Sequence, residues 1–381
     1  MIQMKILADE NIPYVKEVFS HLGEVVTVAG RAITREKAAD ADLLLVRSIT
    51  RVDEGLLKGS RVKFVGTATI GFDHVDVKYL ASRDIRFTSA PGSNATSVAE
   101  YVVSALFNLS KKHGFRLRGR SIGVIGAGNV GSRVAARCRA LGMEVRLNDP
   151  PLAAASKRPE YRPLEALLDC DILTFHVPLE KSGPCPTWKM INAPFLEKTK
   201  KGLILFNTSR GDVADEKAIK TFMAAGHFKA VALDVWENEP RIDVDLLAKT
   251  DIGTPHIAGY SFDGKVKGTE MIYRAAVEFL GVESLWRLTL PPPPVPEIAF
   301  TGEEREAEAC LAAAVTAVYD VTNDSLALKK MAGMEKAAQG PYFDRLRREY
   351  PVRREFANTR VKIKKLTPRL KAAFKALEFV L

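Results

Sequence analysis

The fold is decided by the stretch from Arg120 to Pro150, which reads RSIGVIGAGNVGSRVAARCRALGMEVRLNDP. An apolar run at 121–125 predicts a β-strand, and a second strand is expected at 144–147. Between them lies the pattern G-x-G-x-x-G at Gly126, Gly128 and Gly131, followed by apolar residues at helical spacing. A strand, a glycine turn, a helix and a second strand in this order are typical of a Rossmann dinucleotide-binding unit.

Each glycine of this pattern has its own physical use. They permit a tight turn, a close approach of the backbone to a diphosphate, and close packing of helix on strand. The diphosphate then accepts hydrogen bonds from the free N–H groups at the positive end of the helix dipole. Asp149 lies 18 residues beyond Gly131, near the spacing at which a carboxylate binds ribose hydroxyls. Because that carboxylate repels a 2′-phosphate, the sequence favours NAD over NADP as cofactor.

Length and composition indicate a globular protein of two or three domains. The chain has 381 residues, of which 46% are hydrophobic and 27% charged. The start, MIQMKILADEN, lacks the apolar region of a signal peptide, and no apolar run approaches the roughly 20 residues of a membrane span. The four cysteines, Cys138, Cys170, Cys185 and Cys310, are scattered without metal-type spacing. We therefore expect a cytoplasmic protein with reduced cysteines, no metal site and no membrane association.

The net charge of +10 is concentrated near the C-terminus. Residues 341–381 contain 12 Lys and Arg against four Asp and Glu. A basic segment of this kind can bind nucleic acid, but its usual place is a solvated or subunit-facing surface. Aromatic residues are not interleaved as in a nucleic-acid platform, so we expect no nucleic-acid partner.

The remaining sequence predicts an α/β fold of two doubly wound parallel-sheet domains and a C-terminal α+β domain. Strands expected at 4–8, 24–28, 42–46, 63–66 and 85–88 alternate with helices, the first at 12–22, in a flavodoxin-like domain. An amphipathic helix at 96–113 leads into the glycine turn, and a proline-rich run at 291–296 marks a boundary. The expected domains are a substrate domain at 1–95 with 258–288, an NAD domain at 96–257, and a dimerisation domain at 289–381.

Three polar residues have the character of a catalytic group. Arg210 and Glu239 each follow a predicted strand, and His256 lies in TPHIAGY. The carboxyl ends of parallel strands border the ligand crevice, so the three side chains are expected there. A histidine can take a hydroxyl proton, a carboxylate can orient the ring, and an arginine can bind a substrate carboxylate at two points. His176, in TFHVPL, is a rival base, which we interpret as a wall residue.

These motifs resemble the D-isomer-specific 2-hydroxyacid dehydrogenase family. The resemblance rests on GTATIGFDHVD, GAGNVG, TFHVPL, NTSRG, DVWENEP and HIAGY, within residues 40–280. It implies hydride transfer from a 2-hydroxy acid to NAD, with Arg210, Glu239 and His256 in the roles just described. It also places NAD contacts on Gly126, Gly128, Asn129, Val130, Gly131, Asp149, Val177, Thr208, Asp234 and Gly259.

Further segments resemble a branch of this family that acts on a phosphorylated four-carbon acid. They are ADENIPY, VRSIT, APGSNA and HIAGYSFDGK, with a C-terminal part similar to that branch's dimerisation domain. The resemblance places substrate contacts on Ser48, Thr69 and Tyr260, and implies a homodimer. Two positions depart from the pattern: Val177 replaces a threonine and Ser93 a cysteine, and the likeness ends near residue 356. A substrate phosphate needs a second cationic site, for which the candidates are Arg47, Arg353 and Arg354.

Two alternatives stay open on the sequence. One is another phosphorylated D-2-hydroxyacid dehydrogenase, such as a 3-phosphoglycerate dehydrogenase, against which Tyr260 and the C-terminal part argue. The other is an NAD-binding interaction protein similar to corepressors that share this fold, because a fold alone does not fix a function.

Overall fold

The computed structural model describes residues 4–156, 158–300, 307–364 and 366–381. By its internal contacts the chain divides into two compact units. The first comprises Met1–Asn94 and Ser261–Pro291, and the second comprises Ala95–Tyr260 and Pro292–Leu381. In the part of the chain that the structure describes, no helix combines the length and the apolar character needed to cross a membrane.

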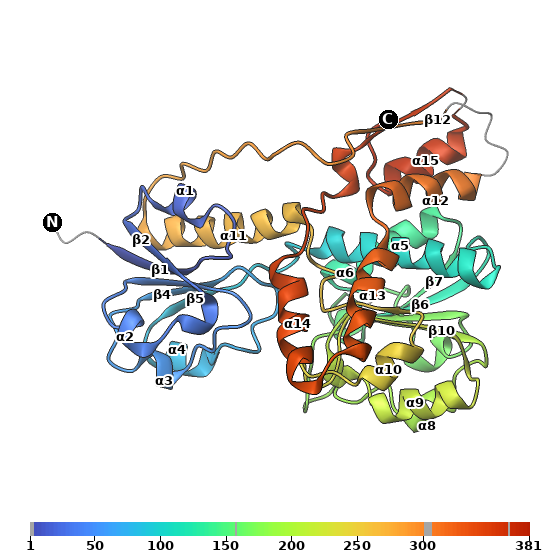
Figure 1. The fold of residues 1–381 in the computed structure, drawn as a ribbon, viewed down its shortest axis with the longest axis horizontal. Helices are drawn as coiled ribbons and strands as arrows, with labels where there is room; N and C mark the ends of the chain where they lie inside the picture. Colours follow the sequence, from blue (N-terminus) through green and yellow to red (C-terminus); the bar gives the residue numbers. More distant parts are fainter. Residues whose placement is uncertain (1–3, 157, 301–306, 365) are drawn as a thin grey trace. The chain divides into compact units, whose positions relative to one another are not determined.

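The first unit is a parallel five-stranded sheet with helices on both faces. Its strand order is β2-β1-β3-β4-β5, with β1 (Lys5–Asp9), β2 (Glu24–Val28), β3 (Leu43–Val46), β4 (Phe64–Thr67) and β5 (Arg86–Thr88). One face packs against α1 (Val15–Phe19) and α11 (Phe262–Leu280), as Figure 1 shows. The other packs against α2 (Arg35–Ala38), α3 (Glu54–Leu57) and α4 (Val77–Ser82). Both faces are therefore buried, which explains why β3 is the continuous apolar run Leu-Leu-Leu-Val.

The second unit contains a parallel six-stranded sheet of order β11-β10-β9-β8-β6-β7. The strands are β6 (Ser121–Ile125), β7 (Glu144–Asn148), β8 (Ile172–Phe175), β9 (Leu203–Asn207), β10 (Phe228–Leu233) and β11 (Ile252–Gly253). The chain enters at β6, moves outward to β7, and then crosses to β8 on the other side of β6. The carboxyl end of β6 is therefore a topological switch point, the place where doubly wound sheets bind ligands.

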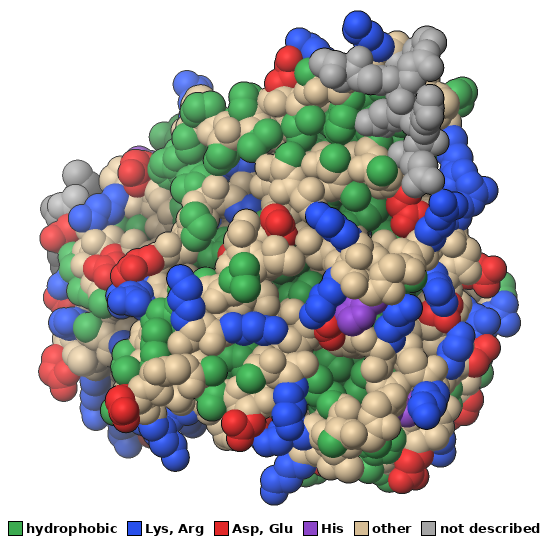
Figure 2. Space-filling model, turned by 45° about the vertical axis from the view of Figure 1, so that its right-hand side comes forward, with side chains coloured by type: hydrophobic (Ala, Val, Ile, Leu, Met, Phe, Trp, Pro, Cys, Tyr) green, Lys and Arg blue, Asp and Glu red, His purple; other side chains and the backbone are tan. Residues whose placement is uncertain are grey.

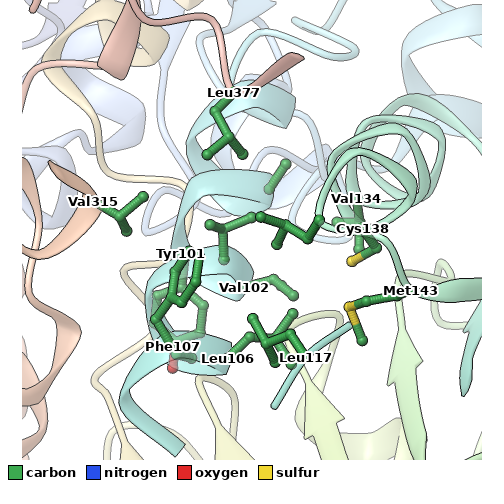
Figure 3. Packing of buried hydrophobic residues seen from close by; sticks show 14 of the residues in the cluster. Tyr101, Val102, Leu106, Phe107, Leu117, Val134, Cys138, Met143, Val315 and Leu377 are labelled. Carbon is green, nitrogen blue, oxygen red and sulfur yellow. The ribbon is translucent and has the colours of Figure 1, made fainter. Parts of the chain in front are cut away.

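Two groups of helices cover this second sheet. On one face lie α5 (Ala95–His113) and α6 (Asn129–Ala140). Val102 and Leu106 of α5 and Val134 of α6 are among the buried apolar side chains drawn in Figure 3. The other face packs against α8 (Ala193–Leu196), α9 (Glu216–Ala224) and α10 (Val244–Lys249). This layered core holds the carboxyl ends of the strands, and the loops that follow them, in fixed positions.

The C-terminal segment shares the core of the second unit. The sequence predicts a domain of its own at 289–381, whereas the contacts of the described residues join this segment to the dinucleotide-binding part. Apolar side chains of α12 (Ala307–Val318) and α15 (Pro368–Ala376) belong to the same cluster as α5 and α6. Helix α13 (Val321–Lys329) joins both faces, because its Val321 belongs to this same cluster and its Leu328 to the cluster on the opposite face, where α14 (Lys336–Arg348) also packs. A parallel strand pair, β12 (Glu297–Phe300) with β13 (Arg360–Ile363), completes the segment.

The basic character of this segment is partly internal. Arg353 and Arg354 are each only 5% exposed. On the face drawn in Figure 2, Lys and Arg side chains are interspersed with acidic and apolar ones. These two arginines therefore add little to the surface charge of the segment, whereas Arg345, Arg348 and Lys371 are exposed.

Candidate active site

The glycine turn has the geometry of a dinucleotide site. Gly126 has a φ of 85°, and a Cβ there would lie 2.7 Å from the carbonyl oxygen of His176. A Cβ on Gly131 would lie 1.9 Å from the carbonyl oxygen of Gly126, so only glycine lets α6 pack this close to the turn. Gly128 differs, because no described residue other than its chain neighbours has an atom within 4 Å of the position that its Cβ would take.

This difference fits the three uses predicted for the glycines. Packing within the protein explains Gly126 and Gly131, whereas Gly128 keeps the backbone open to a ligand. Gly128 is also the N-cap of α6 and provides no side-chain cap for the first N–H groups of that helix. Asn129 and Val130 are the first two residues of α6, so their N–H groups are placed to bind a diphosphate. The residues present therefore fit NAD.

Asp149 is held beside the turn by two backbone bonds. Its Oδ2 accepts a hydrogen bond from the N–H of Ala127 at 2.8 Å, and its Oδ1 accepts one from Leu152 at 3.0 Å. Ionised carboxylate oxygens can accept further bonds, so the same group can take ribose hydroxyls. Val177 lies against the opposite side of the turn, with its Cγ1 2.9 Å from the position of a Cβ on Gly126.

His256 and Glu239 form a direct pair. The Nδ1 of His256 lies 2.7 Å from Oε2 of Glu239, and Oε1 of Glu239 accepts a bond from the N–H of Trp236 at 2.9 Å. The His256 side chain is 35% exposed and that of Glu239 is 20% exposed. With Nδ1 turned to the carboxylate, Nε2 is the ring nitrogen left to exchange a proton with a substrate hydroxyl.

Electrostatics keeps Glu239 ionised. Burial by itself raises the pKa of Glu239, whereas the charge and hydrogen bond of His256 lower it. The charge of Arg347 and the N–H of Trp236 act in the same direction, so the net pKa is lowered. An ionised Glu239 stabilises the imidazolium that forms when His256 takes a proton.

Asp234 shapes the loop that carries His256. Its carboxylate accepts bonds from the hydroxyl of Thr254 at 2.7 Å and from the N–H groups of Ile257 at 2.8 Å and Ala258 at 2.9 Å. The carbonyl of Asp234 accepts the N–H of His256 at 2.7 Å. These bonds hold His256 at a φ of 57°, a left-handed conformation that is strained for a residue other than glycine. The carboxylate is 2% exposed, and this burial raises its pKa.

The loop after β9 presents Arg210. Asn207 braces this loop: its Oδ1 accepts bonds from the N–H and hydroxyl of Ser209, and its Nδ2 donates to the carbonyl of Arg210 at 3.0 Å. A Cβ on Gly211 would lie 1.9 Å from the carbonyl oxygen of Trp236. The Arg210 loop therefore packs directly on the loop that carries Glu239, and the structure brings all three predicted catalytic residues into one loop cluster.

His176, the rival base, is in a different environment. Its ring nitrogens are hydrogen-bonded to two hydroxyls, with Nε2 2.9 Å from Oγ1 of Thr174 and Nδ1 3.0 Å from Oγ1 of Thr208. Burial lowers the pKa of His176 to about 3, so the ring stays neutral. A base whose nitrogens are both occupied cannot readily accept a substrate proton. His176 instead fixes Thr208, a predicted NAD contact.

The predicted substrate residues Ser48 and Thr69 belong to the first unit. They lie two residues beyond Val46 and Thr67, the last residues of β3 and β4, which pair in register. Thr69 is fixed by its Oγ1, which lies 2.7 Å from Oγ1 of Thr67 and donates to the carbonyl of Gly71 at 2.9 Å. The structure thus places both residues at the carboxyl edge of their own sheet.

Two of the arginines considered for a phosphate do not fit that role. The Nη2 of Arg353 donates to the carbonyls of Ser97 at 3.1 Å and Ala258 at 2.9 Å, and its guanidinium lies 4.0 Å from the centre of the Tyr319 ring. Arg354 is tied to Asn358 at 2.7 Å. Both are buried within their own chain, so neither is placed to bind a substrate phosphate. Arg47 lies in the first unit, just beyond β3.

A further arginine, Arg347, lies at the site and was not predicted. Its guanidinium carbon is 5.7 Å from the centre of the Tyr260 ring, and its charge acts on Glu239. Arg347 belongs to α14, in the C-terminal part and outside the motifs that lie within residues 40–280. The one signal in the sequence is helical spacing, which puts Gly340, Phe343 and Arg347 on one face of that helix.

Comparisons with known proteins agree with this geometry. The family model described as "D-isomer specific 2-hydroxyacid dehydrogenase, NAD binding domain" matches residues 94–258. A second model, "Domain of unknown function (DUF3410)", matches residues 289–377. The chain is 46% identical to the erythronate-4-phosphate dehydrogenase of Hahella chejuensis over 99% of each chain. It is also 46% identical to the Escherichia coli O157:H7 protein of the same name over 93% of each.

Solved structures show the same fold. D-lactate dehydrogenase from Aquifex aeolicus, complexed with NAD and lactic acid, has a TM-score of 0.60 and 26% identity, covering 73% of this chain and 96% of that chain. NAD⁺-bound 3-phosphoglycerate dehydrogenase from Entamoeba histolytica has a TM-score of 0.63 and 24% identity, covering 73% of this chain and 96% of that one.

Proposed function

The chain belongs to the D-isomer-specific 2-hydroxyacid dehydrogenase family, and we propose that within it the chain oxidises 4-phospho-D-erythronate with NAD⁺. The products are 2-oxo-3-hydroxy-4-phosphobutanoate, NADH and a proton. NAD is the cofactor of the family and fits the glycine turn and Asp149. The relatives that share 46% of its residues over nearly the whole chain support this substrate. We place the reaction in the biosynthesis of pyridoxal 5′-phosphate.

The observation that carries the proposal is the 2.7 Å contact between His256 and Glu239 beside the Arg210 loop. Nε2 of His256 accepts the proton of the C2 hydroxyl as the C2–H bond breaks and the carbonyl forms. Glu239 stabilises the resulting imidazolium, and Arg210 binds the C1 carboxylate at two points. Bound NAD⁺ supplies the acceptor of the hydride.

Other residues hold the two ligands in this proposal. The cofactor contacts are Gly126, Gly128, Asn129, Val130, Gly131, Asp149, Val177, Thr208, Asp234 and Gly259. The substrate contacts are Ser48, Thr69 and Tyr260. For Val177 the contact is through the backbone, because its side chain is apolar.

A homodimer that forms through residues 289–381 is part of the proposal. Support comes from Leu326, 63% exposed, and Val352, 51% exposed, since large apolar side chains on a surface often mark an interface. A groove of about 440 Å³ lies beside them. Its lining includes Ala327, which follows Leu326 in the sequence, and Pro351, which precedes Val352. A purified chain that sediments as a monomer at micromolar concentration contradicts it. We also propose a cytoplasmic location, consistent with four cysteines that form no disulfide.

The experiment that tests the function is NADH formation by the purified chain with NAD⁺ and 4-phospho-D-erythronate. We expect NADH to accumulate in proportion to enzyme, and no NADH without the acid. If no hydroxy acid of this class is oxidised, the proposed function is wrong and a non-catalytic NAD-binding role gains support.

A further inference from the structure

The proposed substrate carries two anionic groups, a C1 carboxylate and a C4 phosphate, and Arg210 accounts for one of them. We propose that Arg347, on the C-terminal helix α14, binds the phosphate. The identity of the ligand rests on the proposed function, whereas the site itself rests on the contacts of Arg347 within the second unit.

Helix α14 packs on the segment that follows Glu239. A Cβ on Gly340 would lie 3.6 Å from Cγ of Pro240 and 3.7 Å from Cγ of Arg241. Phe343, three residues later, is fully buried in the same apolar cluster as Trp236. Arg347 lies two helical turns beyond Gly340, so it projects from this same face. The packing of the helix therefore directs Arg347 toward the loop of the catalytic pair.

The guanidinium of Arg347 is next to a predicted substrate residue. It lies 5.7 Å from the centre of the Tyr260 ring and 6.0 Å from that of Phe343, and it is hydrogen-bonded to Tyr260. The Tyr260 ring packs edge-on to Tyr350, with 5.8 Å between the centres. Arg347 and Tyr260 thus form one rigid surface, since aromatic rings on either side limit their rotamers.

Arg347 is a partly buried cation without a full set of acceptors. Its Nε is buried and has no hydrogen-bond partner. The charges of Glu239 and Asp344 both act on Arg347, and the two oxygens of Glu239 already accept bonds from His256 and Trp236. A buried N–H group without an acceptor is unfavourable, and an anion that accepts from the guanidinium relieves the cost. A phosphate offers three acceptor oxygens for this purpose.

The position also suits the length of the substrate. In 4-phospho-D-erythronate the phosphate is attached two carbons from C2, the carbon that His256 serves. A phosphate site must therefore lie close to the catalytic pair. Arg347 meets this requirement, because its charge acts on the carboxylate that is bonded to His256. Its neighbours Arg345 and Arg348 do not, since both are exposed and Arg348 pairs with Glu349 at 3.0 Å.

The test uses Arg347→Met and Arg347→Lys in the full-length chain, with Arg348→Met as the matched control. We expect Arg347→Met to raise KM for 4-phospho-D-erythronate by roughly 10²-fold, the usual effect of removing one partner of a buried charge pair. Arg347→Lys should fall between that variant and the wild type. With unphosphorylated D-erythronate, kcat/KM should change less than about threefold, because no phosphate contact is lost. Arg348→Met should behave as wild type with both acids.

Other results overturn the inference. If Arg347→Met lowers kcat equally for both acids and moves the pH–rate profile, the residue supports Glu239 and does not bind phosphate. If the wild type oxidises no phosphorylated acid, the proposed function is wrong. The phosphate site is then tested by calorimetry, which measures binding of inorganic phosphate to the NAD-bound chain. Binding that is lost in Arg347→Met but kept in Arg348→Met supports it. Equal binding by all three chains contradicts it, as does a variant that binds phosphate better than the wild type.

Discussion

At the scale of single residues, environment separates two histidines that look alike in the sequence. His256 faces an ionised carboxylate, whereas His176 lies between the hydroxyls of Thr174 and Thr208 with a pKa lowered by burial to about 3. Proton transfer near neutral pH needs a base that can exist in both forms. Only His256 is supported for that role by its neighbours.

Replacing His256 by alanine should lower kcat by roughly 10²–10⁴, the usual contribution of a general base. The thermal midpoint and the affinity for NAD should change little, because the side chain is partly exposed and is not a predicted NAD contact. Steady-state kinetics with a parallel thermal melt and NAD titration measure these quantities. Activity near that of the wild type would transfer the role to His176.

Glu216 provides a pH-dependent test of the loop packing. Burial raises its pKa from 4.5 to about 7, so the folded state binds a proton that the unfolded state releases. The wild type should therefore lose up to about 3 kcal/mol of stability as pH rises from 4.5 to 7. Glu216→Gln cannot lose this proton, and its oxygen can still accept the N–H of Glu237, now bonded at 2.8 Å.

The stability difference between Glu216→Gln and the wild type should accordingly grow across this pH range. Denaturant unfolding of both chains at several pH values measures the difference, and groups common to both cancel. A difference that stays constant from pH 4.5 to 7 contradicts the account.

The sequence identified some of the site residues because their chemistry is local. Arg210 and Glu239 follow strands directly, and in a parallel sheet this alone places them at the ligand edge. Arg347 could not be found in this way, because its position depends on where α14 packs. The burial of Arg353 and Arg354, two candidates for the phosphate site, could not be predicted from the sequence either.

At the scale of elements, the glycine turn contains one glycine that the packing of the fold requires, Gly131, and one that is open to a ligand, Gly128. A Cβ on Gly131 meets a carbonyl oxygen at 1.9 Å, whereas one on Gly128 meets no atom of the described residues within 4 Å, its chain neighbours apart. The same small substitution should therefore act on different properties at the two positions.

Gly131→Ala should destabilise the chain by about 1–3 kcal/mol or more, because the helix must move away from the turn. Gly128→Ala should keep the melting temperature of the wild type but weaken NAD binding at least about tenfold, because the methyl group meets the diphosphate. Thermal melts and NAD titrations of both variants test this. Equal loss of NAD affinity without any loss of stability in Gly131→Ala would refute the packing argument.

Elements with strong patterns were predicted well, and their ends less so. The helix expected at 96–113 is α5 (Ala95–His113). The helix expected at 12–22 is reduced to α1 (Val15–Phe19), because Tyr14 adopts a left-handed φ of 57° after Pro13. The spacing of apolar residues does not reveal a left-handed backbone conformation, so the predicted helix was longer than α1.

At the scale of the whole molecule, two parallel α/β sheets follow from the strand–helix alternation and are confirmed. The attachment of residues 292–381 to the second unit does not follow from it. The proline-rich run suggested a separate domain, yet the apolar faces of α12 to α15 are completed by clusters on the Rossmann sheet. The proline-rich run therefore marks a break in the sequence, but it does not show against which sheet the helices after it pack.

This arrangement gives the C-terminal segment a part in the chemistry. It carries Arg347 to the catalytic pair, and the proposed dimer contact lies on the same segment. In these proposals the C-terminal segment, which is added to a common dehydrogenase fold, provides both the specificity for a phosphorylated acid and the dimer contact.

The most direct test of the account is kcat/KM of the wild-type chain for 4-phospho-D-erythronate, measured by initial NADH formation beside 3-phospho-D-glycerate. Sites that hydrogen-bond or charge-pair a specific substrate commonly discriminate by about 10²-fold or more. We predict at least that preference for the four-carbon acid. An equal or higher value for 3-phospho-D-glycerate would contradict the proposed function.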